Sequence, residues 1–170
     1  MFQLTTQRLI LREWQAEEWI ALHQILSDPK TMRFWPKPFD EKATQYWIKR
    51  SQESYTEHGI GRYSVWEKST RKLIGDCGVF KTLVNGKKEY DLGYIFHYSS
   101  WGKGYAVEAA QACLDHAQKT LGIERVIANM ASAHYASARV AKRLGMELET
   151  IFINEYNLNH QTYLFSTQNI

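Results

Sequence analysis

The 170 residues of the chain suffice for one domain with a complete hydrophobic core. Hydrophobic residues make up 44% of the chain and charged residues 23%, which is typical of a globular protein. The 21 Lys and Arg against 18 Asp and Glu give a net charge of +3, too small and too scattered for a surface that binds nucleic acid. No segment approaches the roughly 18 consecutive apolar residues of a membrane span. We therefore expect a cytoplasmic protein with neither a nucleic acid nor a membrane as partner.

The cysteines and prolines constrain the architecture further. Cys77 and Cys113 lie far apart and lack the spacing of a CxxC or Cys/His metal site, so we expect no bound metal. We interpret both as reduced and mostly buried thiols, with a thiol nucleophile as the alternative. Three prolines in total, no internal repeat and no linker predict a single domain over residues 1–170.

The first third of the chain predicts one strand and two helices. Residues 8–13 alternate loosely between apolar and polar side chains, which favours a strand. Apolar residues recur at helical spacing over residues 16–28, and Pro29 ends this helix. Asp40 is a suitable N-cap for a second helix, which Gly59 closes.

The pattern then changes to that of antiparallel strands. Residues 62–68, 72–84 and 87–98 are rich in β-branched and aromatic side chains, and polar turns separate them. The Asn85-Gly86 pair predicts a tight hairpin between the second and the third of these strands.

The rest of the chain alternates between strands and helices. It predicts, in order, a helix over residues 103–121, a strand over 125–131, a helix over 135–145 and a final hairpin of strands 147–156 and 161–167. The step from residues 92–96 through the 103–121 helix to 125–131 is a β-α-β crossover, so those two strands should be parallel neighbours. The sequence therefore predicts an α/β (α+β) fold, with a mixed, mostly antiparallel sheet of about seven strands and helices on both faces.

Two glycines at the start of the 103–121 helix point to an anion site. The first N–H groups of a helix lack partners within it, and the helix dipole adds positive charge there. In "WGKGYA", Gly102 and Gly104 leave room for phosphate oxygens to reach the backbone. Ala106 is small, and Lys103 can add a charge at the rim. We interpret this loop as a pyrophosphate site; the alternative is a helix start that needs only a turn and close packing.

Several motifs, in matching order and with matching gaps, resemble those of the Gcn5-related N-acetyltransferases (GNAT). They read "YDLGYIFH", "WGKGYAVEA" and "SARVAKRLGM". The opening "TTQRLILRE" and the loop "FWPKPFDE" are similar to the branch that includes the ribosomal-protein N-terminal-alanine acetyltransferases. The resemblance covers nearly the whole chain. It implies the GNAT fold, with acetyl-CoA bound as cosubstrate at a central β-α-β site.

The resemblance assigns the coenzyme to two adjacent segments. The family's pyrophosphate loop corresponds to Trp101, Gly102, Lys103, Gly104, Tyr105 and Ala106, with Trp101 in place of the usual Arg or Gln. The preceding strand would splay from its parallel neighbour and pair with the pantetheine arm through Leu92, Gly93, Tyr94, Ile95 and Phe96. A backbone N–H near Tyr94 or Ile95 would then stabilise the oxyanion; the alternative is an ordinary central strand with a packing glycine. His134, Ser137 and Arg143 complete the expected coenzyme site.

The general acid of many relatives, a tyrosine, corresponds to Ala141 here and is therefore missing. The nearer branch has a serine one turn earlier, after an asparagine. Ser137 matches the serine, whereas His134 replaces the asparagine. Three interpretations stay open. Ser137 protonates the coenzyme sulfur with His134 beside the pantetheine, or both residues only cap the helix and contact solvent, or Tyr135 is the acid.

Asp91 occupies a position at which the branch often has a glutamate, so it could accept the proton of the amine directly or through water. A structural carboxylate and a simple water path are the alternatives. His97 is another candidate for the base, but it lies nearer the end of the strand. The acceptor pocket should lie across the splayed strands from the nucleotide. We assign Phe34, Trp35 and His97 to it, although aromatic side chains beside proline also belong to packed cores.

The expected function is transfer of an acetyl group from acetyl-CoA to a primary amine of a protein N-terminus, an amino acid or a small molecule. The resemblance implies direct attack in a ternary complex, without a covalent enzyme intermediate. The rival hypotheses are a coenzyme-binding sensor that has lost catalysis and an enzyme that uses a longer acyl-CoA. The chain could be a monomer or a homodimer, because strand edges in the C-terminal hairpin could pair between subunits.

Overall fold

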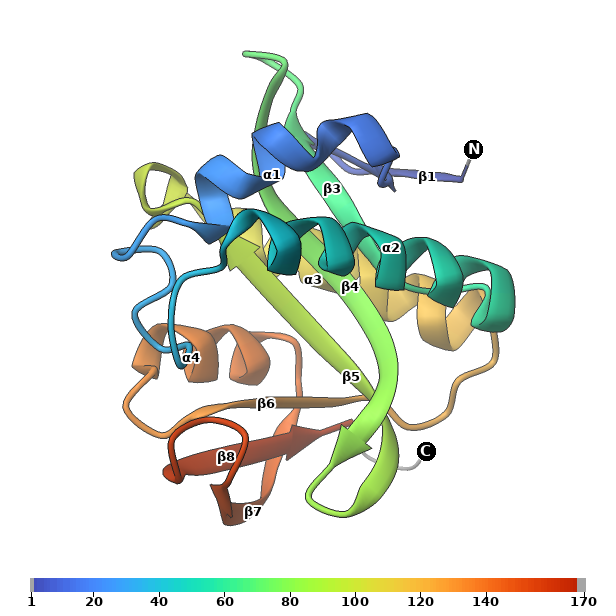
Figure 1. Ribbon diagram of the computed structural model, residues 1–170. Helices are drawn as coiled ribbons and strands as arrows, with labels where there is room; N and C mark the ends of the chain where they lie inside the picture. The colour runs from blue at the N-terminus through green and yellow to red at the C-terminus, as the bar shows by residue number, and fades with distance from the viewer. Residues whose placement is uncertain (1, 168–170) are drawn as a thin grey trace.

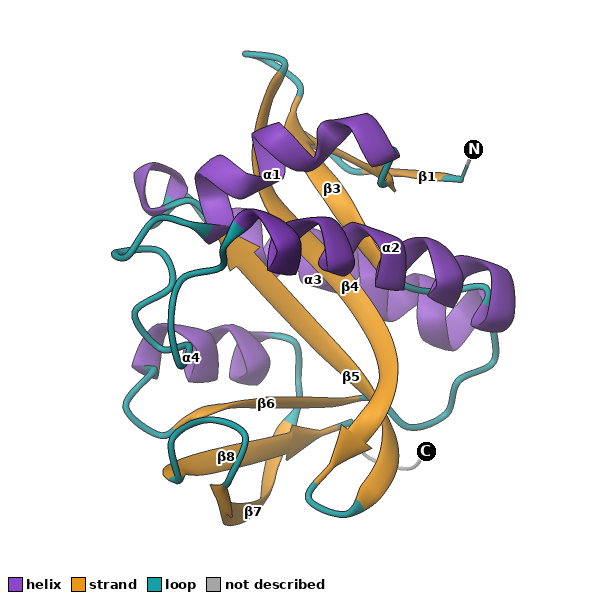
Figure 2. Ribbon diagram, viewed as in Figure 1, coloured by secondary structure: helices purple, strands orange, loops and turns teal. Residues whose placement is uncertain are grey.

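The computed structural model describes residues 2–167, which fold into an eight-stranded sheet with helices on both faces (Figures 1 and 2). The strands are β1 (Gln3–Thr5), β2 (Leu9–Glu13), β3 (Arg62–Glu67), β4 (Lys72–Val84), β5 (Lys87–Phe96), β6 (Ile127–Ala131), β7 (Glu147–Asn154) and β8 (His160–Ser166). The helices are α1 (Trp19–Leu26), α2 (Glu41–His58), α3 (Tyr105–Asp115) and α4 (Tyr135–Arg143). Short 3-10 turns occupy Ala16–Glu18 and Tyr98–Ser100, and a π-helical turn occupies His116–Thr120.

The strands lie in the order β1-β2-β3-β4-β5-β6-β8-β7. Every neighbouring pair is antiparallel except β5 and β6, which are parallel and joined through α3, so the predicted crossover is confirmed. These two strands pair only at Asp91 and Ile127, and beyond that point they diverge (Figure 1). The edge of β5 that faces β6 is therefore unpaired over residues 92–96.

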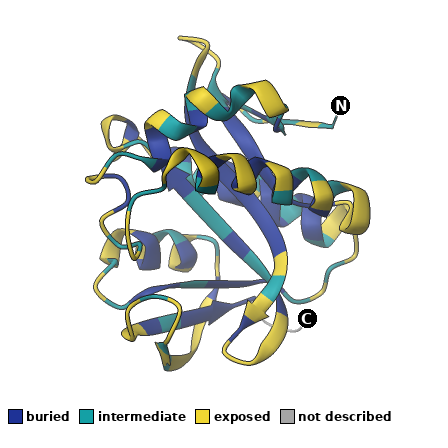
Figure 3. Cartoon of the chain, in the orientation of Figure 1, coloured by how far each residue is buried: buried dark blue, intermediate teal, exposed yellow. Residues whose placement is uncertain are grey.

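The two faces of the sheet have separate cores. Helices α1 and α2 lie across one face and α3 across the other (Figure 1). On the α1–α2 side, Trp14, Leu22 and Ile48 form a cluster with Phe80 of β4. The small side chains of α3 and α4 pack on the opposite face in the larger cluster. The central strands are accordingly the most buried part of the chain (Figure 3).

Local signals in the sequence fix several of these elements. The Asp40 side chain accepts a hydrogen bond from the amide of Ala43 at 2.8 Å, which confirms it as the N-cap of α2. Asn85 and Gly86 have φ angles of 46° and 77°, as expected of the tight turn that connects β4 and β5. The register of the two strands continues up to this turn, where Val84 pairs with Lys87.

The structure corrects the predicted elements at three points. It has eight strands and not about seven, because β1 pairs with β2 although its three residues are too short to show a period. The helix predicted over 103–121 begins at Tyr105, and its last turn is π-helical. That wider turn lets the consecutive residues His116 and Ala117 both face the interior. The helix predicted over 16–28 begins as a 3-10 turn.

The two cysteines are free, buried thiols, as predicted. Their sulfur atoms lie 3.8 Å apart, Cys77 on β4 and Cys113 on α3, which the sequence did not indicate. Within residues 2–167, no group of His, Cys, Asp or Glu side chains could hold a metal ion. No helix of the described chain is sufficiently long and apolar to cross a membrane.

Candidate active site

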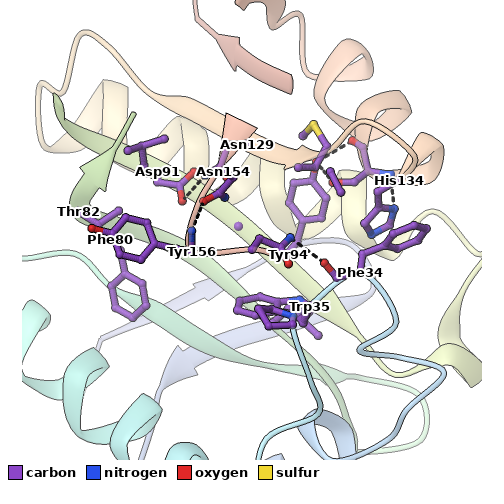
Figure 4. A pocket seen from close by; sticks show the side chains of 18 of the residues that line it. Phe34, Trp35, Phe80, Thr82, Asp91, Tyr94, Asn129, His134, Asn154 and Tyr156 are labelled. Carbon is purple, nitrogen blue, oxygen red and sulfur yellow. Dashed lines mark hydrogen bonds between the residues drawn. The ribbon is translucent and has the colours of Figure 1, made fainter. Parts of the chain in front are cut away.

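A cavity of about 750 Å³ opens on the α1–α2 side of the sheet, where β5 and β6 part. The loop between α1 and α2 forms one wall, and the β7–β8 hairpin forms another (Figure 4). Asn157 in the β7–β8 turn joins these walls, because its Nδ2 donates to the carbonyl oxygen of Phe34 at 3.0 Å. Residues 91–95 of β5 form part of the floor.

A buried ion pair lies under the cavity. Nε of Arg62 is 2.7 Å from Oδ2 of Asp76, and both side chains are almost completely buried. The indole nitrogens of Trp14 and Trp47 also donate to this carboxylate, at 2.8 Å and 3.2 Å. The Asp76 carboxylate thus has three donors, which is the condition for keeping a charged pair inside a protein. Arg62 also lines the cavity, directly beside Gly93.

Asp91 lies at the point where β5 leaves β6, and its carboxylate faces the cavity (Figure 4). Its Oδ2 accepts a hydrogen bond from Nδ2 of Asn129 at 3.0 Å, whereas Oδ1 is buried without a partner among the described residues. Burial raises the pKa of Asp91 to about 7, against the opposing effects of Arg62, Asn129 and Arg50. The carboxyl group therefore exchanges its proton near neutral pH.

Two hydroxyl groups meet across the gap between β5 and α4. The hydroxyl of Tyr94 donates to the carbonyl oxygen of Ser137 at 2.8 Å. The Ser137 hydroxyl in turn donates to the Tyr94 oxygen at 3.2 Å. Burial raises the pKa of Tyr94 above its ordinary value, so this phenol stays protonated. Both residues line the cavity, and together they form a proton-donating pair.

His134 is the N-cap of α4. Its Nδ1 accepts a hydrogen bond from the amide of Ser137 at 3.3 Å, and its ring stacks on Phe34 with 4.1 Å between the ring centres. Burial, together with the positive charge of Arg33, lowers the pKa of His134 to about 4. The imidazole is therefore neutral at pH 7, so its Nδ1 can accept the hydrogen bond of the Ser137 amide.

The glycine loop lies at the start of α3, on the other side of β5. Gly102 and Gly104 have φ angles of 74° and 79°, which favour glycine. A Cβ at Gly102 would meet no atom within 4 Å, so the backbone there is open to a ligand. The amides of residues 102–107 donate to no acceptor within the described chain. The local conformation thus supplies the free amides that an anion needs.

Side chains in and around the glycine loop attach it to neighbouring segments. The Trp101 indole donates to the carbonyl oxygen of Phe96 at 2.8 Å, which ties the loop to the end of β5. Tyr105 is buried, and its hydroxyl bonds to Glu67, so only its backbone faces the loop. Arg8 donates to the carbonyl oxygen of Lys103 at 2.8 Å. Trp101 and Tyr105 therefore act on the loop as structural supports.

The structure gathers many, but not all, of the predicted site residues. The cavity is lined by those assigned to the acceptor, to the proton steps and to most of the open strand: Phe34, Trp35, Asp91, Leu92, Gly93, Tyr94, Ile95, His134 and Ser137. His97, Tyr135 and Arg143 lie outside this lining. Tyr135, the third candidate for the acid, is 70% exposed. Arg143 is also exposed, at the end of α4.

Four polar residues stand out among the residues of the cavity that sequence reasoning missed. Arg62 lies at its floor, Asn129 holds Asp91, Arg50 of α2 forms part of its wall, and Asn157 closes the hairpin side. Only Asn129 had a usable signal, because it lies in β6 near the predicted crossover partner of Asp91. The other three come together through contacts between distant segments.

The eight-stranded sheet, with β5 and β6 parted and a glycine loop ahead of α3, is the architecture that the resemblance to the GNAT class implied. The chain belongs to the GNAT family, since the family described as "Acetyltransferase (GNAT) domain" matches residues 8–147. It is similar to "Uncharacterized N-acetyltransferase YnaD" of Bacillus subtilis (strain 168), with 31% identity over 150 residues that cover 88% of this chain and 85% of that protein. These findings confirm the family that the motifs predicted.

Solved structures share the whole fold. The crystal structure of a GNAT-family acetyltransferase from Bacillus anthracis has a TM-score of 0.82 and 26% identity, and the match covers 99% of both chains. RimL, described as a ribosomal L7/L12 alpha-N-protein acetyltransferase in complex with coenzyme A, has a TM-score of 0.81 and 19% identity, with 98% of this chain and 97% of that chain covered. The predicted GNAT fold is thereby confirmed.

Proposed function

We propose that the protein transfers an acetyl group from acetyl-CoA to a primary amine, which attacks directly within a ternary complex. The position of Asp91 carries this proposal. Its carboxylate lines the cavity where β5 and β6 part, and its pKa is raised to about 7. A base that titrates near the working pH is suited to removing the proton of an attacking amine.

The residues of the chain fit acetyl-CoA at two adjoining places. The free amides of 102–107, with open space at Gly102, suit the diphosphate. The unpaired edge of β5 over 92–96 offers backbone groups to the pantetheine arm. When bound, acetyl-CoA would supply the activated acetyl group. Metal chemistry has no part in the proposal.

The cavity residues divide the proton steps between them. Asp91 accepts the proton of the amine at its unpartnered Oδ1, while Asn129 holds Oδ2 in place. On the α4 side, the Ser137 hydroxyl can donate a proton and is itself within hydrogen-bond distance of the Tyr94 hydroxyl. Among the three interpretations of the acid, this geometry favours Ser137. A coenzyme thiolate leaves readily, so the contribution of Ser137 is modest.

The test is an acetyl-transfer screen with acetyl-CoA that measures release of the free thiol and the mass of the product. The acceptors are N-terminal peptides of ribosomal proteins, free amino acids, polyamines and aminoglycosides. We expect at least one of them to gain the mass of one acetyl group. Tight coenzyme binding without turnover on any acceptor would support the sensor hypothesis instead. Transfer only from a longer acyl-CoA would show in the product mass.

A further inference from the structure

Arg50 places a cation in the wall of the cavity, and no ion pair among residues 2–167 neutralises it. It lies on α2, and its Nη2 donates to the Thr82 hydroxyl at 3.1 Å. The guanidinium carbon lies over the Phe80 ring, 4.3 Å from its centre. The ion pairs of residues 2–167 all use other cations. Of the five N–H donors of this guanidinium, most are therefore without an acceptor.

The cavity as a whole carries an excess of positive charge. Its lining includes the cations Lys37, Arg50 and Arg62 and a single acidic residue, Asp91. Arg62 is neutralised by the buried Asp76, so it adds no net charge. Of the two remaining cations, Arg50 acts on the Asp91 carboxyl group, whose pKa is itself about 7, and Lys37 is an exposed lysine of the lining. A half-buried cation without a counter-ion is unfavourable in the free protein, and a ligand that brings a carboxylate would relieve this cost.

From this charge arrangement we infer that the acceptor is a zwitterion, an amine that carries a carboxylate close by, and that Arg50 is the residue that selects it. The inference rests on the proposed function. The amine group faces Asp91 while the carboxylate binds the guanidinium of Arg50, a geometry that favours two parallel hydrogen bonds. The aromatic rings around the cavity suit an apolar side chain on the same molecule: Trp35, Phe39, Trp47 and Phe80.

This acceptor chemistry excludes the polycationic amines. A polyamine or an aminoglycoside carries several positive charges, and these would meet Lys37 and Arg50 without enough carboxylates to balance them. A free amino acid and a short peptide with an acidic second residue both carry an amine and a carboxylate. The free amino acid places the two groups closest together, and the experiment below separates the two sources.

The experiment compares matched acceptors. Apolar and aromatic amino acids are each paired with the amine that lacks the carboxylate, and further arms contain a dipeptide amide with aspartate in second position and spermidine. We expect kcat/KM to be at least tenfold higher for the amino acid than for its amine. Arg50→Gln should raise KM for the amino acid about tenfold and change kcat less than threefold. For the matched amine, kcat/KM of this variant should stay within twofold of the wild-type value. Arg50→Lys should recover part of the loss.

Lys49→Gln is the matched control, because Lys49 precedes Arg50 on α2, pairs with Glu53 and lies outside the cavity lining. Calorimetric titration of the amino acid into the protein with coenzyme A bound provides a second readout that needs no turnover. Arg50-dependent binding without transfer would sustain the zwitterion site and refute the proposed function. Two results would overturn the inference while leaving the acetyltransferase intact. One is a higher kcat/KM for spermidine than for the amino acids, and the other is an equal loss of kcat/KM for an amino acid and its matched amine in Arg50→Gln.

Discussion

The guanidinium of Arg62 occupies the space that a side chain at Gly93 would need. A Cβ built on Gly93 would stand 1.8 Å from Nη1 of Arg62. The same guanidinium is held by Asp76 through its Nε atom at 2.7 Å. The glycine in the middle of β5 therefore makes room for a buried ion pair beneath the cavity, in addition to any freedom it gives the strand.

We expect Gly93→Ala to lower the free energy of unfolding by about 3 kcal/mol, because the methyl group displaces Arg62 and leaves the Asp76 charge poorly compensated. Urea unfolding followed by circular dichroism measures the change. A double-mutant cycle with Arg62→Met provides the control. In that background Gly93→Ala should cost less than about 1 kcal/mol. An equal cost in both backgrounds would show that Arg62 is not the cause.

Asp91→Asn should lower kcat/KM about 100-fold, because the amide cannot accept the proton of the amine. In the wild type, kcat/KM should rise with pH through about 7, where the carboxyl group loses its proton. The variant should lack this rise. Asn129→Ala is the companion variant: it removes the hydrogen bond that lowers the pKa of Asp91, so the rise should move to higher pH. A profile unchanged in both variants would exclude Asp91 as the base.

The same carboxyl group links stability to pH. The pKa of an unfolded aspartate is about 3.9, and the folded pKa of Asp91 is about 7. Between these values the folded protein binds a proton that the unfolded chain has released, so this contribution to stability is complete below about pH 4 and lost as pH rises through 7. Asp91→Asn should therefore gain stability relative to wild type between pH 4 and pH 8. Thermal melts across this range test the sign.

Gly102→Val should weaken coenzyme A binding at least tenfold, because its side chain would stand where phosphate oxygens approach the amides. Gly122→Val is a close control. Both glycines flank the same helical segment, with φ angles of 74° and 67° and no atom within 4 Å of a built Cβ. The backbone strain of the two substitutions is thus matched. If calorimetry found equal affinities for both variants, the loop would not be the diphosphate site.

His134→Ala should destabilise the protein by about 1 kcal/mol through loss of the N-cap of α4. His134→Asn should keep the cap, since a side-chain oxygen can accept the Ser137 amide as the neutral imidazole does. We expect the asparagine variant to retain kcat within about threefold of wild type. A much larger loss in His134→Asn, at unchanged stability, would instead assign the histidine a direct role in the reaction.

Much of the fold follows from signals contained within a few residues. Asp40 caps α2, and Asn85-Gly86 closes the hairpin, because each conformation depends on its nearest neighbours. The parting of β5 from β6 was expected only from the family resemblance. The strand β1 was missed, since three residues held by a neighbouring strand carry no periodic pattern of their own.

The site residues also fall into those with a local sequence signal and those without one. The glycine loop could be predicted because Gly102 and Gly104 lie two positions apart, directly ahead of a helix. The burial of Arg62 against Asp76 and the contact of Asn157 with Phe34 depend on how distant segments align, which composition and spacing do not encode. The sequence likewise did not show that Tyr135, the first residue of α4, is exposed to solvent, because that depends on how α4 packs on the sheet.

The hydrogen bond from Asn157 to the Phe34 carbonyl joins segments 123 positions apart, and it belongs to a turn that has no role in the glycine loop. Mutations in residues 155–159 can therefore change one wall of the cavity while the glycine loop at the start of α3 stays unchanged. Under the proposed function, substitutions in this turn would alter the acceptor wall without changing the residues proposed to hold the coenzyme. This separation also makes this short turn the natural target for directed evolution of altered selectivity.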